Sequence, residues 1–317
     1  MPRSVSIYLG SKCNANCAYC HRVSEPEQND CSNLIAKIKE WHPQNINFFG
    51  GEPLLYMEQI KKIVSTFPDA AFRLTTNGLL LPKYKDFLLE HKFHIVLSFD
   101  GLQEHSLRCV DIPEIDLSEF PRVSISTTLY HNNADLDLLD KAFCFLEKKL
   151  NRRLSIYPHI MHVTSESNIP YALTKEDYDR IIKGVIGRVK RLIETYEKYG
   201  VLLRRNTGYL YILSRQKDLA PGETGCVSKE HIKTDLNGNS WDCLYIRNQL
   251  VTLPHTLPDE FKNCYDCEYY SSCGAACVKS IRHNMECYYY KSLFCWWKKY
   301  YPQHKKAIEE IRRATLD

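Results

Sequence analysis

The stretch Cys13-Asn-Ala-Asn-Cys17-Ala-Tyr-Cys20 carries three cysteines in a Cys-x3-Cys-x2-Cys pattern. It follows residues 5–9, a short apolar run typical of a first β-strand. Three thiolates this close in sequence are expected to bind one metal centre, and a four-iron cluster held by three cysteines keeps one iron open for a further ligand. Structural zinc usually takes four protein ligands, arranged in Cys-x2-Cys pairs. The spacing therefore favours an iron–sulfur cluster over zinc.

Strand-like and helix-like runs alternate through the first two-thirds of the chain. Runs rich in β-branched, aromatic or alternating apolar residues predict six strands, at residues 5–9, 45–49, 72–76, 94–99, 123–129 and 154–159. Amphipathic runs predict helices at residues 34–41, 57–67, 83–90, 136–150 and 175–199, the last with Thr174 and Asp177 as a capping pattern. Strands that alternate with helices indicate right-handed βαβ units and a parallel sheet. Six units predict an α/β fold, a partial (β/α)6 barrel rather than the closed eight-stranded TIM barrel.

Glycines and polar side chains follow the second, third and fourth predicted strands. Gly50-Gly-Glu-Pro53 follows the second strand, Thr-Thr-Asn77-Gly ends the third, and Ser98-Phe-Asp100-Gly ends the fourth. Because the carboxyl ends of parallel strands meet at one edge, we expect these segments to lie above one mouth, together with the cysteine loop. The two glycines allow close backbone approach to a ligand, and a glutamate can accept a hydrogen bond from an ammonium group.

The bulk composition is that of a soluble globular protein. Hydrophobic residues make up 44% and charged residues 25% of the 317 residues, and the net charge of +4 is too mild to indicate a nucleic-acid partner. No apolar run is long enough to span a membrane, and the first residues lack the apolar region of a signal peptide, so we expect a cytoplasmic location. In that reducing compartment, a chain with 14 cysteines binds metal or does redox chemistry more often than it forms disulfides.

Eight of the 14 cysteines follow residue 225, just beyond a turn-rich stretch at residues 220–225. We place a domain boundary there, with residues 1–215 as the barrel and residues 216–317 as a small Cys-rich domain. The second part has little regular periodicity, so bound metal is expected to hold it together. Its last stretch, residues 298–313, is basic and amphipathic, which predicts a closing helix rather than a nucleic-acid surface.

The order of the N-terminal motifs resembles that of the radical S-adenosylmethionine (radical SAM) superfamily. The resemblance implies a 4Fe-4S cluster on Cys13, Cys17 and Cys20, whose open iron would chelate the amino and carboxylate groups of S-adenosylmethionine. In that family one electron from the cluster cleaves S-adenosylmethionine and leaves a 5′-deoxyadenosyl radical, while the protein supplies placement and excludes water. The residues that the resemblance implies as cofactor contacts are Tyr19, Gly50, Gly51, Glu52, Pro53, Asn77, Ser98, Asp100 and Arg108.

The later cysteines resemble the SPASM domain of radical enzymes that modify ribosomally made peptides. They match its spacing from Cys226 to Cys295, including a Cys-x2-Cys-x5-Cys-x3-Cys run that starts at Cys264. The resemblance implies two auxiliary 4Fe-4S clusters, an outer one on Cys264, Cys267, Cys273 and Cys295 and an inner one on Cys226, Cys243 and Cys277. Cys287 is the alternative to Cys295, which the longer gap favours. Because the inner set has three cysteines, an open iron, a non-cysteine ligand and a smaller cluster are all left open.

The resemblance implies a peptide maturase. We favour an intramolecular crosslink in a ribosomally made (RiPP) precursor peptide, through a thioether, carbon–carbon or ether bond, because two auxiliary clusters can accept the electron that a net oxidation releases. The alternatives are peptide epimerisation, with an unligated Cys287 as hydrogen donor, and oxidation of a small-molecule alcohol or sugar by a SPASM dehydrogenase. A zinc-stapled binding module is a distant alternative. Leu244 stands where sulfatase-maturing relatives carry an aspartate, which counts against formylglycine formation.

The partners expected from the resemblance are a precursor peptide and an electron donor such as flavodoxin or ferredoxin. Because the first predicted strand begins within five residues of Met1, we expect no fused domain that grips the precursor's leader. A separate leader-peptide-binding protein is therefore a further expected partner.

Overall fold

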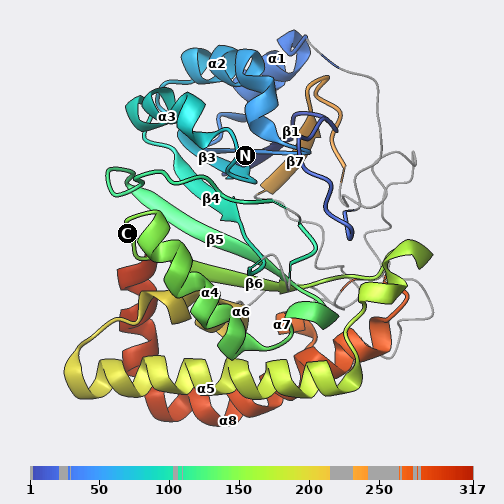
Figure 1. Ribbon diagram of the computed structural model, residues 1–317, viewed down its shortest axis with the longest axis vertical. Coiled ribbons are helices and arrows are strands. Elements are labelled where there is room, and N and C mark those ends of the chain that lie inside the picture. Colours follow the sequence, from blue (N-terminus) through green and yellow to red (C-terminus); the bar gives the residue numbers. More distant parts are fainter. Residues whose placement is uncertain are drawn as a thin grey trace.

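The described part of the chain is built on one seven-stranded parallel sheet (Figure 1). The computed structural model describes residues 3–20, 28, 30–102, 106–108, 110–214, 231–241, 264, 266–273, 277 and 280–316. The strand order is β6-β5-β4-β3-β2-β1-β7, and every neighbouring pair is parallel. The strands are β1 (Ser4–Tyr8), β2 (Asn45–Phe49), β3 (Ala71–Thr76), β4 (His94–Ser98), β5 (Arg122–Leu129), β6 (Ser155–Ile160) and β7 (His231–Asp235). This confirms the predicted α/β fold of the partial-barrel type.

The first six strands lie within one residue of their predicted bounds, but β7 is an addition that the sequence did not predict. It pairs in parallel with β1, from Ser4 opposite His231 to Tyr8 opposite Asp235. Its five residues contain one large aliphatic side chain, Ile232, so its local pattern is too weak to indicate a strand. β7 comes from beyond the predicted domain boundary, which itself falls on residues 215–230, outside the described residues. The C-terminal part of the chain thus contributes to the barrel sheet.

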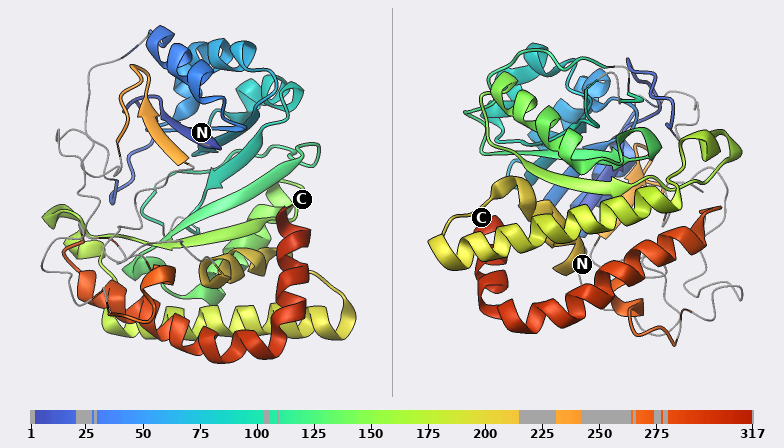
Figure 2. Two further views of the ribbon diagram at one scale, coloured as in Figure 1. Left: turned by 180° about the vertical axis from the view of Figure 1, so that it is seen from behind. Right: turned by 60° about the horizontal axis from the view of Figure 1, so that its bottom comes forward.

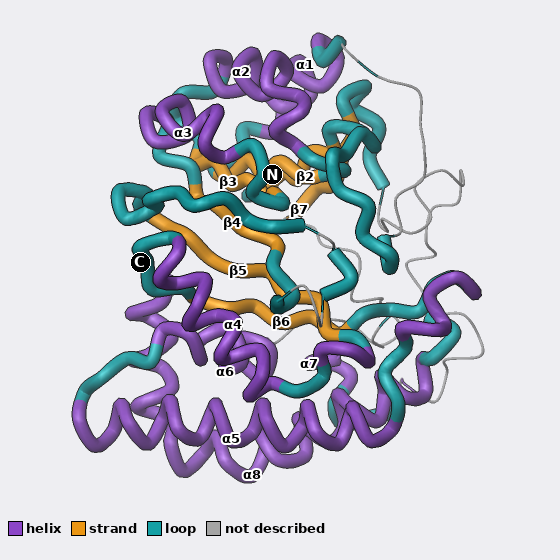
Figure 3. Tube along the Cα trace, viewed as in Figure 1, coloured by secondary structure: helices purple, strands orange, loops and turns teal. Residues whose placement is uncertain are grey.

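Helices cover the sheet on its outer side (Figures 1 and 3). Helices α1, α2 and α3 lie together near β1, β2 and β3, whereas α5 and α8 lie side by side below β6 in Figure 1. The α-helices are α1 (Ser32–Trp41), α2 (Met57–Thr66), α3 (Leu81–Glu90), α4 (Leu136–Lys149), α5 (Lys175–Tyr199), α6 (Thr207–Ser214), α7 (Tyr270–Cys273) and α8 (His283–Leu316). Short 3-10 turns occupy Pro53–Tyr56, His131–Asn133, Glu166–Tyr171 and Arg204–Asn206.

The long helix α5 begins with the predicted capping box. The Thr174 hydroxyl accepts from the Asp177 backbone N–H at 3.2 Å, and the Asp177 carboxylate accepts from the Thr174 backbone N–H at 2.9 Å. Burial works against the charge of Asp177, but hydrogen bonds from His131 and Thr174 leave its pKa below the ordinary value. The predicted closing helix, residues 298–313, lies in the second half of α8. The first half of α8 runs alongside α5, and past a kink at His304 the helix turns away from α5 toward the C-terminus (Figure 2).

The two faces of the sheet differ in chemistry because side chains alternate along each strand. Ile7, Phe48 and Leu74 are fully buried on the helix-covered face and belong to the main apolar core. The opposite, inner face carries polar side chains, for example Asn47, whose amide donates to the Ser6 hydroxyl at 3.3 Å. The barrel therefore has an apolar outer layer and a polar interior.

Gly208 lies where α6 packs closely on β6, and Gly187 in α5 is a control position without such a contact. A Cβ added at Gly208 would lie 1.7 Å from the Ile156 carbonyl oxygen, whereas a Cβ at Gly187 of α5 would meet nothing within 4 Å. We expect Gly208→Ala to destabilise the fold by about 3 kcal/mol or more, because α6 must move off the sheet backbone. Gly187→Ala should instead raise the free energy of unfolding by about 0.5–1 kcal/mol, since alanine favours a helix. Urea unfolding of both variants checks this, and equal effects would contradict the packing described.

Candidate cofactor site

The loop that carries the three N-terminal cysteines leaves the carboxyl end of β1 and is tied to the segment after β2. The Gly51 backbone N–H donates to the Gly10 carbonyl at 2.8 Å, and the Glu52 backbone N–H donates to the Lys12 carbonyl at 2.7 Å. The Tyr56 hydroxyl accepts from the Lys12 backbone N–H at 2.8 Å. These bonds fix the start of the cysteine loop against the end of the neighbouring strand.

The two glycines after β2 have a local structural reason. A Cβ at Gly51 would lie 2.1 Å from the Lys12 carbonyl oxygen, so no larger residue fits without moving the cysteine loop. Gly50 has a φ of +149°, in the region that favours glycine, and its own Cβ would lie 2.7 Å from the Gly10 carbonyl oxygen. The sequence predicted that these glycines allow the backbone to approach a ligand closely. In the structure they allow the segment after β2 to approach the cysteine loop closely.

Glu52 is fully buried and bonded to protein groups. Its carboxylate accepts from the Thr76 hydroxyl at 2.7 Å, the Asn77 backbone N–H at 2.8 Å and the Leu54 backbone N–H at 3.1 Å. Burial raises the pKa of Glu52, and the hydrogen bonds from Asn77 and Thr76 oppose this rise. The side chain thus joins the ends of β2 and β3 and caps the short turn that begins at Pro53. Its contact with an ammonium group stays a prediction.

Asn77 extends the same support to the first cysteine. Its side-chain amide donates to the Asn14 side-chain oxygen at 2.8 Å and lies 3.8 Å from the Cys13 sulfur. Its side-chain oxygen accepts from the Leu79 backbone N–H at 3.0 Å, which fixes the orientation of the amide. Asn77 therefore positions the cysteine loop from the end of β3.

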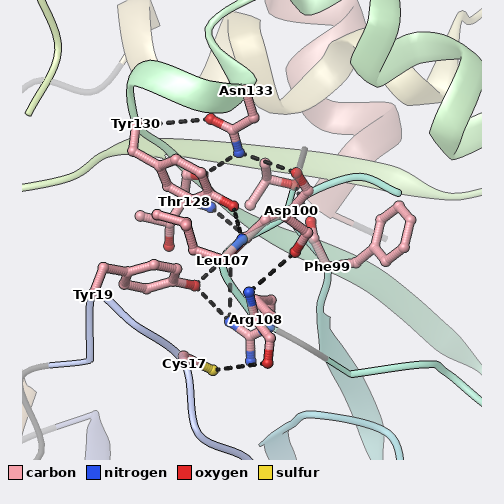
Figure 4. A network of polar contacts seen from close by, with 11 residues as sticks. Cys17, Tyr19, Phe99, Asp100, Leu107, Arg108, Thr128, Tyr130 and Asn133 are labelled. Atoms are coloured by element: carbon pink, nitrogen blue, oxygen red, sulfur yellow. Dashed lines mark hydrogen bonds and ion pairs between the residues drawn. The ribbon is translucent and has the colours of Figure 1, made fainter. Parts of the chain in front are cut away.

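Asp100, just after β4, is the centre of a polar network that contacts the cysteine loop at Tyr19 (Figure 4). Its fully buried carboxylate accepts from the Tyr19 hydroxyl and, at 2.8 Å, from the Thr128 backbone N–H. The Arg108 guanidinium donates to the Tyr19 hydroxyl at 2.8 Å and lies 3.7 Å from the carboxylate. The Asn133 amide donates to the Asp100 carbonyl at 3.0 Å. Tyr19, Asp100 and Arg108, which were all predicted as cofactor contacts, thus lie together although they come from separate segments of the chain. Ser98, the last residue of β4, pairs in register with β5 nearby.

The charges in this network are set by burial and by one another. Burial raises the pKa of Asp100, and the positive charge of Arg108 opposes the rise. Burial works to lower the pKa of Arg108, but the charges of Asp100 and Tyr19 outweigh it and leave that pKa above its ordinary value. Burial, followed by the charge of Asp100, raises the pKa of Tyr19, so its phenol keeps its proton. The result is a fixed cation, Arg108, beside the cysteine loop.

The three thiols of the loop fit an iron–sulfur cluster by their chemistry. Burial raises the pKa of Cys17, the charge of Arg108 lowers it, and Cys20 and Cys13 raise it, so the thiols lie within electrostatic range of one another. None of the three is in a disulfide. Among the described residues, no three His, Cys, Asp or Glu side chains converge as the ligands of one metal ion do. Cluster ligands each bind a different iron, so they need not converge in this way.

The C-terminal cysteines are described in part. Cys264, Cys267, Cys273, Cys277, Cys287 and Cys295 are free thiols, whereas Cys226 and Cys243 lie outside the described residues. Burial raises the pKa of Cys264, and Cys287 and Cys267 raise it further, so these thiols are neighbours. Cys295 interacts with Tyr269. The structure therefore places the alternative late ligand, Cys287, near Cys264, and Cys295 as the late ligand stays a prediction.

Glu286 and His162 form a buried acid–histidine pair beside Cys277 that the sequence did not predict. The fully buried Glu286 carboxylate lies 2.9 Å from the His162 ring nitrogen and accepts from the Cys277 backbone N–H at 3.4 Å. Its second oxygen, Oε1, has no hydrogen-bond partner among the described residues. Because His162 and Glu286 are 124 positions apart, no local pattern could have indicated the pair.

Comparison with known proteins agrees with this geometry. Residues 7–120 match the model of the Radical SAM superfamily. The chain contains a radical SAM domain. The match covers about a third of the chain, and the relatives matched over the same region are named as enzymes, a GTP 3',8-cyclase and a cyclopropyl synthase. A match to the radical SAM domain implies S-adenosylmethionine and a 4Fe-4S cluster. No helix in the part of the chain that the structure describes is long and apolar enough to cross a membrane.

The sequence relatives match only the N-terminal part of this chain. A GTP 3',8-cyclase from Chlorobaculum tepidum is 35% identical over 116 residues, which cover 33% of this chain and 35% of the relative. The radical SAM cyclopropyl synthase TigE from Paramaledivibacter caminithermalis is 25% identical over 128 residues, covering 31% of this chain and 27% of the relative. The chain thus spans about a third of the length of the curated relatives it matches.

The solved structures share the fold over much more of the chain. Native anSMEcpe with bound AdoMet and Cp18Cys peptide superimposes with a TM-score of 0.68 at 19% identity, covering 98% of this chain and 100% of that one. Streptococcus suis SuiB bound to the precursor peptide SuiA has a TM-score of 0.55 at 15% identity, covering 87% of this chain and 72% of that one. The fold therefore extends beyond the region matched by sequence.

Proposed function

We propose that the protein is a radical SAM peptide maturase that abstracts hydrogen from a ribosomally made precursor peptide and forms an intramolecular crosslink. The observation that carries the proposal is the cysteine loop, which is tied at once to the ends of β2, β3 and β4. Gly51 and Glu52 hold its start, Asn77 holds Cys13, and the Asp100 network holds Tyr19. Binding groups on rigid strand ends can keep a reacting centre within the narrow tolerance that catalysis requires.

In this proposal Cys13, Cys17 and Cys20 hold a 4Fe-4S cluster. When bound, the cluster supplies the electron that cleaves S-adenosylmethionine to a 5′-deoxyadenosyl radical. The Arg108 guanidinium and the Asp100 network orient the bound cofactor, and Ser98 and the Gly50 to Pro53 turn bind its ribose and amino group. Because Asp100 and Glu52 are fully buried, their main task is to hold these binding loops in place.

The C-terminal part, residues 216–317, is proposed to hold the two auxiliary clusters. Cys264, Cys267, Cys273 and Cys295 bind the outer cluster, and Cys226, Cys243 and Cys277 bind the inner one. Five of these seven cysteines are among the described residues and all five are free thiols, which supports the assignment. Such clusters can receive the electron that crosslink formation releases, which favours a crosslink over an epimer.

The peptide substrate is supported by the structural neighbours. Both anSMEcpe and SuiB were solved with peptides bound, and the first spans nearly all of this chain. A cytoplasmic flavodoxin or ferredoxin would supply electrons, and a separate protein would present the leader peptide. The GTP 3',8-cyclases match only about a third of the chain, so a small-molecule substrate is the second candidate.

Metal analysis tests the cluster assignment. After anaerobic purification we expect about twelve irons per chain, with matching sulfide, falling to about eight in Cys13→Ala/Cys17→Ala/Cys20→Ala. The triple variant should keep its auxiliary clusters and lose cleavage of S-adenosylmethionine. Zinc without sulfide, or an iron count that the triple change leaves untouched, would sink the proposal.

The substrate class is tested by the release of 5′-deoxyadenosine. We expect a precursor peptide encoded beside the gene to stimulate release and to lose two hydrogens, measured as a mass decrease of about 2 Da. An unchanged mass in H2O, together with uptake of one deuterium when the reaction is run in D2O, would instead indicate epimerisation. Stimulation by a small alcohol, a sugar or a nucleotide, but by no peptide, would refute the maturase assignment.

A further inference from the structure

A basic cavity lies at the amino edge of the sheet, on the side opposite the cysteine loop. It has a volume of about 530 Å³, within the range of small-molecule sites, and it opens between the first residues of β4, β5 and β6 and the end of α8. His94 and Arg122 lie on its wall. At roughly 3.3 Å per residue, His94 is about 13 Å from Ser98 at the other end of β4. The cavity is thus separate from the candidate cofactor site.

Four arginines line the cavity, and its lining contains no aspartate or glutamate. Among the described carboxylates nearby, Asp116 is bonded to Ser118 and Asn151, and Glu147 is paired with Arg153. The arginines are Arg122, Arg152, Arg153 and Arg204. Arg153 is neutralised by Glu147, at 3.1 Å. The guanidinium of Arg152 donates to backbone carbonyls, among them those of Ser118 at 2.9 Å and Pro121 at 3.1 Å. Arg152 is thus held in place without losing its charge.

The remaining two arginines have no ion-pair partner in the described part of the chain. Arg122 and Arg204 are both exposed to the cavity and form no salt bridge with a described carboxylate. Arg73, from the neighbouring strand β3, adds a further positive charge. Burial lowers its pKa, Tyr157 and Tyr211 oppose this, and Arg122 lowers it further. Burial and the nearby Arg204 likewise lower the pKa of Arg152. Positive charge therefore accumulates on Arg73, Arg122, Arg152 and Arg204, none of which forms an ion pair with a described carboxylate.

The polar groups between the arginines are hydrogen-bonding and neutral. Burial, with smaller effects from Arg73 and Arg122, lowers the pKa of His94 to about 3, so its ring is uncharged at neutral pH. Its Nε2 lies 2.9 Å from the Ser124 hydroxyl, which also lines the cavity. A half-enclosed site lined by guanidinium groups and neutral hydrogen-bonding groups suits an oxyanion. One guanidinium can donate to two oxygens of a carboxylate or phosphate at once.

We propose that this cavity binds an oxyanion, a phosphate or carboxylate group of a small ligand, through Arg122 and Arg204. Bound there, the anion offsets the repulsion between Arg122 and Arg73 and between Arg204 and Arg152. Because the site is on the other edge of the sheet, its ligand does not compete with S-adenosylmethionine. The inference does not depend on the peptide maturase assignment.

Calorimetric titration of the cluster-loaded protein with inorganic pyrophosphate, and separately with citrate at the same ionic strength, tests the proposal. We expect at least one of them to bind, and the tighter of the two identifies phosphate or carboxylate as the preferred group. In Arg122→Gln/Arg204→Gln the affinity should fall at least tenfold. Arg191→Gln, on the exposed side of α5 and away from the cavity, removes one charge and should leave the affinity unchanged.

Cleavage of S-adenosylmethionine without substrate serves as the second readout. It should be the same in the wild type and the double variant, because neither arginine belongs to the cofactor site. Failure of both anions to bind the wild type, or equal affinity in the wild type and the double variant, would overturn the proposal. Neither result would bear on the maturase assignment, which is judged by 5′-deoxyadenosine release.

Discussion

Asp100→Leu is expected to destabilise the protein by about 3–5 kcal/mol and to abolish cleavage of S-adenosylmethionine. The carboxylate is fully buried, and its loss leaves Arg108 beside the cysteine loop without its counter-charge. Removing one partner of a buried ion pair costs far more than the intact pair contributes, because the other charge stays desolvated. The Tyr19 hydroxyl and the Thr128 backbone N–H lose their acceptor at the same time. Anaerobic urea unfolding measures the first effect, and 5′-deoxyadenosine release measures the second.

Two further variants define what the network does. Asp100→Asn keeps an acceptor for the Thr128 backbone N–H but loses the charge, so we expect a smaller loss of stability with cleavage still strongly impaired. Glu119→Gln removes an exposed partner of Lys85 and should change neither property noticeably. If Asp100→Leu behaved like Glu119→Gln, the network would have no role in holding Arg108 and Tyr19.

Gly51→Ala is expected to lower cleavage of S-adenosylmethionine about 100-fold while the protein still folds. The atoms nearest to the added methyl would be backbone atoms, among them the Lys12 carbonyl oxygen at 2.1 Å and the Ser11 carbonyl oxygen at 2.7 Å, so the cysteine loop must move. A displacement of about 1 Å at a reacting centre can cost about a hundredfold in rate. The cost in stability should stay within about 1–3 kcal/mol, as for other overpacked sites.

Measurements on Gly51→Ala should separate misplacement from unfolding. We expect its circular dichroism to match that of the wild type and its iron content to fall, because the loop no longer presents its thiols correctly. Gly187→Ala is the matched control, since its added methyl meets nothing within 4 Å. Wild-type cleavage in Gly51→Ala would show that the close approach of the two loops is not needed.

Much of the fold could be predicted because its signals are local. Residues 45–49 alternate as a half-buried strand and form β2 with the predicted bounds, and Thr174 with Asp177 begins α5 as their spacing indicated. The order of cysteines, glycines and polar strand ends was enough to expect one cofactor site at the carboxyl edge. These features depend on neighbours in the chain, and each segment carries them by itself.

What the sequence by itself determined is thus the alternation of strands and helices and the kinds of residue gathered at one edge. Only the tertiary structure decided which of them touch: Gly51 against Lys12, Tyr19 on Asp100, and β7 beside β1. Tyr19 and Asp100 are 81 positions apart, and His162 and Glu286 are 124 apart. Contacts at such separations arise from the packing of whole elements, so no local pattern encodes them. The same reason explains why the basic cavity, assembled from the beginnings of three strands and the end of α8, became visible only in the folded chain.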